Sequence, residues 1–120
     1  MSQEKESDKI LEFKSSLADF KQQIKATPEP VCCSFLANWC SPCRRLSGLI
    51  PQLDTEFSSI KFIRIDVDEN PEVAEYYGIT GIPTVKIFRG VDENGDPLEI
   101  DEVQGFDNAK IREKLSKVAQ

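Results

Sequence analysis

Hydrophobic and polar residues alternate along this chain with two different periods, and each change of period marks a predicted element. Apolar residues spaced three or four apart indicate amphipathic helices, whereas apolar residues at every second position, or in a short continuous run, indicate strands. Strands are expected at 9–13, 31–37, 60–68, 84–90 and 98–105. Helices are expected at 15–26, 44–59, 71–78 and 106–120. The predicted order is therefore β-α-β-α-β-α-β-β-α.

Single residues support several of these boundaries. Ser15 or Ser16 is expected to cap the first helix, and Asn70 and Asp107 are expected to cap the third and fourth. Pro51 falls inside the second helical pattern, where it predicts a kink because proline lacks a backbone N–H.

The order of elements predicts an α/β fold. Strands separated by helices imply right-handed crossovers and a central sheet covered by helices on both faces. The polar turn at 92–96 joins the last two strands as a hairpin, so the sheet is expected to be mixed. We expect five strands flanked by four helices in one domain over residues 9–120, after an N-terminal tail at residues 1–8.

The length, net charge and residue content of the chain exclude several classes of function. A chain of 120 residues is typically one domain and can bury a core without disulfides. Its formal net charge of −6 argues against a nucleic-acid or anionic-membrane partner. The sequence has no histidine, which excludes histidine-based catalysis and Cys2His2 zinc sites.

The N-terminal residues bear on the compartment. They lack both the apolar segment of a secretory signal and the arginine-rich pattern of a transit peptide, and no apolar run reaches the roughly 18 residues of a spanning helix. We therefore expect a cytoplasmic protein with reduced thiols. In that setting its four cysteines are more typical of catalysis or metal binding than of a structural framework.

The sequence WCSPC at 39–43 carries the candidate chemistry. Cys40 follows a predicted buried strand, Pro42 suits the first helical position, and Cys43 falls in the first helical turn. A helix N-terminus offers free N–H groups and a positive dipole end, which stabilise a thiolate. We predict that Cys40 attacks a substrate disulfide and that Cys43 then resolves the mixed disulfide.

The sequence is less consistent with two other uses of this cysteine pair. A zinc ribbon needs a second Cys-x-x-Cys about 15–20 residues away, but Cys32 and Cys33 are adjacent in a predicted strand. Adjacent strand residues point to opposite faces, so both cannot join one tetrahedral site. A Cys40–Cys43 structural staple would close a short loop and stabilise little. Metal binding stays open as the remote alternative.

The chain resembles the thioredoxin family over about residues 9–119. The resemblance rests on FLANWCSPC at 35–43, Pro51, DVDENPEVAEYYGI at 66–79, GIPT at 81–84 and Gly105. A Trp-Cys-x-x-Cys motif followed at this distance by Ile-Pro-Thr is a specific combination.

The resemblance implies a thioredoxin fold with Cys40 as nucleophile and Cys43 as resolving thiol. It implies a cis peptide bond before Pro83 and an Ile82 backbone that meets an extended substrate segment. The implied substrate surface comprises Trp39, Ser41, Pro42, Ile82, Pro83 and Gly105.

The resemblance also implies how the protein works in a cell. It would reduce protein disulfides without a bound cofactor or metal, and an NADPH-dependent thioredoxin reductase would recharge it. Clients would include disulfide-containing proteins such as peroxiredoxins or reductases, in electron transport and cell redox homeostasis. We expect a monomer. An oxidase or isomerase of the disulfide-isomerase kind, and a thioredoxin-like binding or adaptor module, are the alternatives.

Four features depart from the family pattern or stay open. Thioredoxins usually carry a buried aspartate that helps deprotonate the resolving cysteine; here Ser34 occupies that position, so resolution would depend on water or another group, unless serine simply fills the space. Ser41 replaces the usual glycine and could donate a hydrogen bond to Cys40. The acidic hairpin over 90–102 is a solvated loop or a partner-selecting one. Cys32 and Cys33 are small buried hydrophobes or a regulatory thiol pair.

Overall fold

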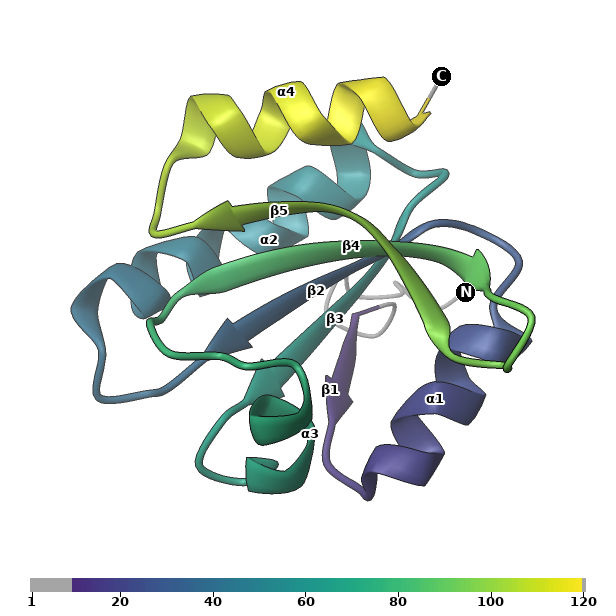
Figure 1. The fold of residues 1–120 in the computed structure, drawn as a ribbon. Helices are drawn as coiled ribbons and strands as arrows, with labels where there is room; N and C mark the ends of the chain where they lie inside the picture. The colour runs from purple at the N-terminus through teal and green to yellow at the C-terminus, as the bar shows by residue number, and fades with distance from the viewer. Residues whose placement is uncertain (1–9, 120) are drawn as a thin grey trace, which may run out of the picture.

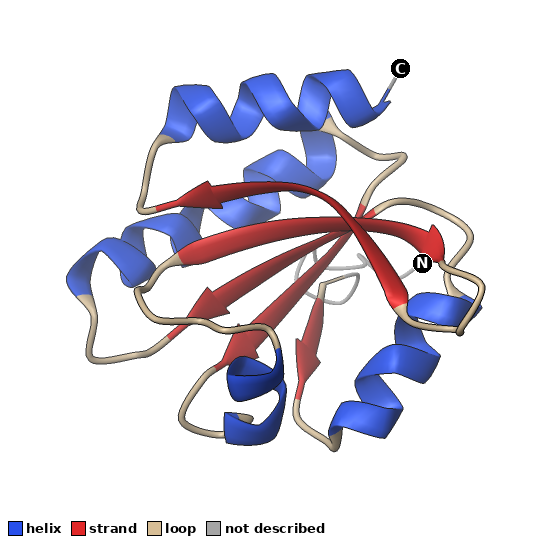
Figure 2. Cartoon of the chain, viewed as in Figure 1, coloured by secondary structure: helices blue, strands red, loops and turns tan. Residues whose placement is uncertain are grey.

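The computed structural model describes residues 10–119. Its elements follow the predicted order (Figures 1 and 2). The strands are β1 Leu11–Phe13, β2 Val31–Leu36, β3 Lys61–Asp66, β4 Thr84–Val91 and β5 Pro97–Gln104. The helices are α1 Leu17–Ala26, α2 Ser41–Glu56, α3 Pro71–Tyr76 and α4 Asn108–Ala119. The tail predicted at residues 1–8 lies outside the described residues.

The five strands form one mixed sheet in the order β1-β3-β2-β4-β5. β3 pairs in parallel with both β1 and β2. β4 runs antiparallel to β2, and β5 runs antiparallel to β4. The predicted mixed sheet and closing hairpin are therefore confirmed, and β2 lies at the centre.

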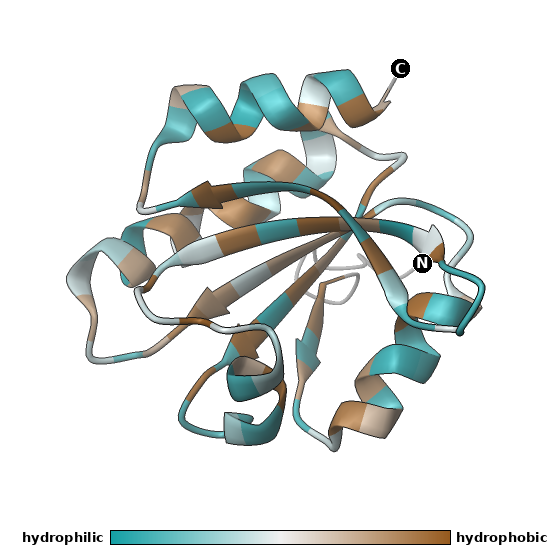
Figure 3. Ribbon diagram, in the orientation of Figure 1, coloured by the Kyte–Doolittle hydropathy of each residue, from teal (hydrophilic) through white to brown (hydrophobic). Residues whose placement is uncertain are grey.

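Helices cover both faces of this sheet. α2 and α4 lie on one face, and α1 and α3 lie on the other (Figure 1). Each face has its own apolar core: Cys32 and Leu36 belong to the α2/α4 core, while Val31, Cys33 and Phe35 belong to the α1/α3 core. All six residues of β2 are buried. The predicted burial of this strand on both faces is confirmed, and Figure 3 shows it coloured mostly as hydrophobic.

The α1/α3 core is rich in aromatic rings. Phe20 contacts Phe13, Tyr77 and Phe88 edge to face, at ring-centroid distances of 5.5, 5.6 and 5.9 Å. Edge-to-face rings fix one another's orientation and add to the stability gained from burial.

Three predicted helix starts are confirmed, and one capping role is corrected. The Ser16 side chain accepts the backbone N–H of Asp19, and Asp107 accepts that of Lys110. Asn70 is the residue before α3 but makes no side-chain cap. Its amide instead donates to the carbonyls of Phe13 and Asp66, because tertiary partners are within reach.

α2 differs from its predicted bounds. It begins at Ser41, ahead of the apolar pattern at 44–59 and one residue before the Pro42 expected at the first helical position, because Cys40 serves as its N-cap. It ends at Glu56. The helix continues through Pro51. Within residues 10–119, no helix is long and apolar enough to cross a membrane.

Candidate redox site

The two motif cysteines lie at the start of α2, where β2 leads into the helix. Cys40 is the N-cap residue, and its Sγ accepts the backbone N–H of Cys43 at 3.4 Å. Both cysteines are free thiols, and Cys40 is 8% exposed against 1% for Cys43. The structure therefore places Cys40 nearer the surface, at the helix end where N–H groups are unpaired.

Cys43 is held in its protonated form. Burial raises the pKa of its thiol to about 12, and its contact with Cys40 adds to the rise. The backbone of Ala37 and the charge of Arg44 act in the opposite direction and are weaker. A Cys43 that is to act as a nucleophile therefore needs a group that removes its proton.

A second segment, far along the chain, faces Cys40. The peptide bond between Ile82 and Pro83 is cis, as predicted. The Cys40 thiol donates to the Ile82 carbonyl oxygen at a sulfur–oxygen distance of 3.8 Å. Gly105, with a φ of 83° that favours glycine, donates its N–H to the Pro83 carbonyl at 2.8 Å. The fold thus assembles the predicted site from α2, the loop before β4 and the end of β5.

Trp39 is the most prominent apolar side chain of this surface. It is 66% exposed, and its indole Nε1–H donates to Oδ2 of Asp68 at 2.8 Å. The sequence analysis did not foresee that Asp68 orients the indole. Asp66 caps the same turn, because its Oδ1 accepts the N–H groups of Asp68 and Glu69.

The remaining motif residues border the same surface. Ser41 is exposed and Pro42 is half-buried in the first turn of α2. The hydrogen bond expected from Ser41 to the Cys40 sulfur comes instead from the Cys43 N–H.

Two arginines follow the motif. Arg44 donates to the Asn38 carbonyl at 3.0 Å. The Arg45 guanidinium lies 5.8 Å from the centroid of the Phe106 ring. Both arginines are exposed helix residues, and these contacts place their side chains beside the site.

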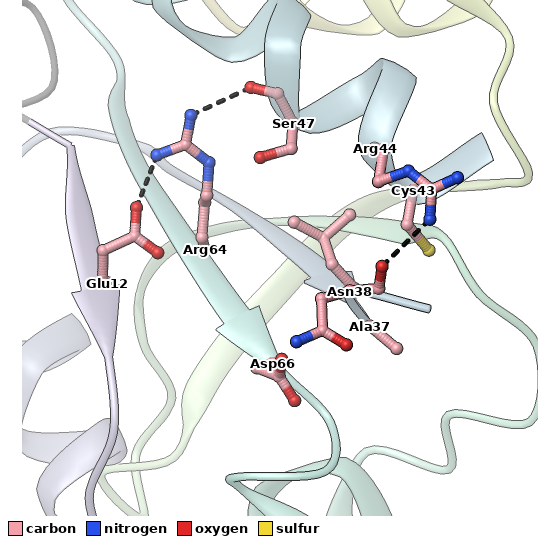
Figure 4. A pocket seen from close by; sticks show the side chains of 9 residues that line it. Glu12, Ala37, Asn38, Cys43, Arg44, Ser47, Arg64 and Asp66 are labelled. Carbon is pink, nitrogen blue, oxygen red and sulfur yellow. Dashed lines mark hydrogen bonds and ion pairs between the residues drawn. The ribbon is translucent and has the colours of Figure 1, made fainter. Parts of the chain in front are cut away.

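A pocket of about 210 Å³ borders Cys43 (Figure 4). Its lining includes Glu12, Arg64 and Asp66, whereas Ser34 is buried in β2 and does not line it. Within the described residues, no cluster of three or more Cys, Asp or Glu side chains is arranged to hold a metal ion.

Comparison with known proteins identifies the family. A family model described as Thioredoxin matches residues 12–117. The chain belongs to the thioredoxin family. A thioredoxin of Geodia cydonium is 38% identical over 109 residues, which cover 90% of this chain and 98% of that protein. A thioredoxin of Pyropia yezoensis is 44% identical over 73 residues, covering 60% of this chain and 68% of that one.

Solved structures agree. The structure of Trichomonas vaginalis thioredoxin superposes with a TM-score of 0.84 at 30% sequence identity, covering 92% of this chain and 97% of that one. This thioredoxin-family chain therefore has the thioredoxin fold and is a thiol–disulfide oxidoreductase of protein substrates. Thioredoxins act through a redox-active dithiol, and here Cys40 and Cys43 lie together at the start of α2.

Proposed function

We propose that this chain reduces protein disulfides, with Cys40 as the attacking thiol and Cys43 as the resolving thiol. The observation that carries this proposal is the asymmetry of the pair. Cys40 caps α2 and faces the Ile82 carbonyl, while Cys43 lies enclosed behind it. A bulky disulfide substrate has access to the first sulfur and not to the second.

The reaction takes two exchange steps. The Cys40 thiolate attacks one sulfur of the client disulfide, the client S–S bond breaks, and the other client sulfur leaves as a thiolate that takes up a proton. The Cys43 thiolate then attacks Cys40, the bond from Cys40 to the client breaks, and the second client sulfur leaves. The client gains two electrons and two protons, and the protein ends with a Cys40–Cys43 disulfide.

The client segment would lie against Trp39, Ser41, Pro42, Ile82, Pro83 and Gly105. An extended segment could add beside Ile82 through main-chain hydrogen bonds, as in strand addition. Support comes from the contacts that join these loops: Cys40 to Ile82, and Gly105 to Pro83. The exposed indole of Trp39 adds an apolar face next to the reacting sulfur.

The oxidised protein must be reduced again. We place this step with an NADPH-dependent thioredoxin reductase, and we propose peroxiredoxins and other disulfide-forming enzymes as clients, in electron transport and cell redox homeostasis. One structural neighbour, at 22% identity, was solved in a study of the thiol resolving mechanism in yeast mitochondrial 1-Cys peroxiredoxin via glutathione/thioredoxin systems. We propose a cytoplasmic monomer, because that compartment keeps thiols reduced.

The deciding measurement is the equilibrium reduction potential of the Cys40–Cys43 couple in a glutathione buffer, with Cys40→Ser as control. A value near about −270 mV is expected for a reductant, while a value near about −180 mV would favour an oxidase or isomerase. If no two-electron couple appears, the chain is a binding module. Consumption of NADPH in the presence of a thioredoxin reductase and a disulfide client tests the recharging step.

A further inference from the structure

The pocket beside Cys43 is shaped by one arginine held at two points. Nη1 of Arg64 donates to Glu12, and Nη2 donates to the backbone oxygen of Ser47 at 2.9 Å (Figure 4). The Ser47 oxygen is available because its helical partner would be the N–H of Pro51, which proline lacks. The guanidinium therefore spans from β1 to α2 and is fixed at the pocket wall.

The third nitrogen of this guanidinium is unsatisfied. Arg64 Nε is buried and has no hydrogen-bond partner among residues 10–119. Buried donors in native proteins are normally paired with protein or with ordered water. A pocket of about 210 Å³ has room for several water molecules, and the charged and polar residues on its lining offer them hydrogen-bond partners.

Asp66 lines the same pocket as Cys43, and its strand pairs with the end of β2 that leads to the Cys43 thiol. It is the register partner of Leu36 at the end of β2, and the thiol contacts the backbone of the next residue, Ala37. Oδ1 of Asp66 accepts two backbone N–H groups, whereas Oδ2 has no hydrogen-bond partner within the described part of the chain. A carboxylate oxygen is thus free to accept a proton from pocket water.

The other carboxylate of the pocket is less suited. Glu12 lies on β1, which β3 separates from β2. Its side chain is 66% exposed and is paired with Arg64. Ser34 offers a hydroxyl, which is no base at neutral pH, and it does not line the pocket.

We propose that Asp66 accepts the Cys43 proton through water in this pocket, with Arg64 Nε orienting that water. The inference rests on the proposed role of Cys43 as the resolving thiol. Cys43 loses its proton to water as that water gives one to Asp66. The Cys43 sulfur then attacks Cys40, the Cys40–client bond breaks, and the client sulfur leaves with the electron pair. Asp66 finally releases its proton to solvent.

Several charged groups face this proton path. The pocket presents Glu12 from β1, Arg44 from α2 and Arg64 from β3, while the carboxylates of Asp68 and Glu69 follow Asp66 in the turn. A carboxylate base makes the resolution rate nearly independent of pH between about pH 6 and 8. Without it, hydroxide must take the proton, and the rate would rise about tenfold per pH unit.

The test uses the full chain, reduced, with the aromatic disulfide 5,5′-dithiobis(2-nitrobenzoate). Attack by Cys40 releases one coloured thiolate at a rate that depends on reagent concentration. Resolution by Cys43 releases a second at a rate that does not. For Asp66→Asn, which keeps the acceptor for the two turn N–H groups, we expect an unchanged first phase. We expect a second phase about 10- to 100-fold slower that rises steeply with pH.

Two further measurements separate proton transfer from a structural effect. Added formate, a small carboxylate that fits the pocket, is expected to restore the second phase of Asp66→Asn in proportion to its concentration. The matched control Glu69→Gln, a neighbouring carboxylate outside the pocket, is expected to keep both phases of the parent protein.

Specific outcomes would overturn the inference. An Asp66→Asn second phase with the rate and pH profile of the parent would exclude Asp66, and loss of the second phase in Glu12→Gln alone would assign the proton to Glu12. A failure of the proposed function has a different signature. Release of a second equivalent by Cys43→Ser, at a rate independent of reagent concentration, would show that Cys43 is not the resolving thiol.

Discussion

Two cysteine pairs lie close together in this chain and have opposite surroundings. Cys32 and Cys33 sit in the middle of the central strand β2, one facing each core, and both are buried. Cys40 and Cys43 sit just beyond the end of the same strand, at the N-terminus of α2. The same residue type therefore packs in the core at one place and forms the reaction centre a few residues later.

The difference lies in the backbone around each sulfur. In β2 the backbone N–H groups are used by the sheet. Burial raises the pKa of Cys32 to about 12 and raises that of Cys33 well above its usual value. At the start of α2 the Cys43 N–H is free to donate to the Cys40 sulfur. The comparison indicates that the end of a buried strand, where a helix begins, makes a thiol chemically useful.

The largest expected effect comes from exchanging the nucleophile. Cys40→Ser should lower the rate of protein-disulfide reduction by about 1,000-fold or more, because a hydroxyl cannot replace the attacking thiolate. Cys33→Ser should retain the rate of the parent chain. The readout is reduction of a protein disulfide under saturating dithiol. Comparable losses in the two variants would remove the functional contrast between the pairs.

Alkylation of the native protein should divide the four cysteines in the same way. Cys40 is expected to react first with iodoacetamide at neutral pH. Cys32 and Cys33 should react at least about 1,000-fold more slowly. The reagent reaches them only when the domain opens, and opening costs a free energy of at least about 5 kcal/mol. Mass spectrometry of partly labelled protein measures the order. Labelling of either strand cysteine as fast as Cys40 would contradict its enclosed position.

The sequence was sufficient for the features set by local pattern. Alternation along β2 placed Cys32 and Cys33 on opposite faces, and the motif placed Cys40 and Cys43 at a helix start. Both follow from the period of the elements, which depends only on neighbouring residues.

The features that sequence reasoning missed depend on how distant segments meet. The bond from Trp39 to Asp68 joins two loops, and no spacing rule predicts it. Pro51 predicts that one carbonyl in α2 lacks its helical hydrogen bond. That Arg64 donates to this carbonyl depends on how α2 packs against β3, which the sequence pattern does not show. Asn70 is a residue type that commonly caps helices, but its side-chain amide instead donates to backbone carbonyls from other parts of the fold.

The two serine substitutions should affect stability in the opposite order to activity: Cys33→Ser should lower stability more than Cys40→Ser. Cys33→Ser buries a hydroxyl among aromatic rings and should lower the free energy of unfolding by about 1–3 kcal/mol. Cys40→Ser should cost little or stabilise slightly, because serine is a preferred N-cap residue. Urea unfolding under reducing conditions measures both, with Cys33→Ala as the control that removes the sulfur without adding a hydroxyl. A Cys40→Ser variant less stable than Cys33→Ser would show that the site, and not the strand, depends on its thiol for packing.

The smallest effect is a difference in pH dependence. Burial raises the folded-state pKa of Cys32 to about 12, whereas an unfolded thiol titrates near about 8.5. Above that pH the unfolded chain loses a proton that the folded chain keeps, so this contribution to stability is complete below about pH 8.5 and declines as pH rises toward 12. The slope reaches at most about 1.4 kcal/mol per pH unit for one thiol.

Cys32→Ala removes that slope and leaves the other titrating groups in place. The unfolding free energies of reduced parent and variant, measured in urea from about pH 8 to 10, should therefore converge as pH increases. Cys43 acts in the same direction, since burial raises its pKa too, but oxidation to the Cys40–Cys43 disulfide abolishes its titration and leaves that of Cys32 intact. The convergence should consequently persist in the oxidised protein. If oxidation removed it, the two cysteine pairs would titrate as one coupled system, and the separation between packing thiols and reacting thiols would not hold.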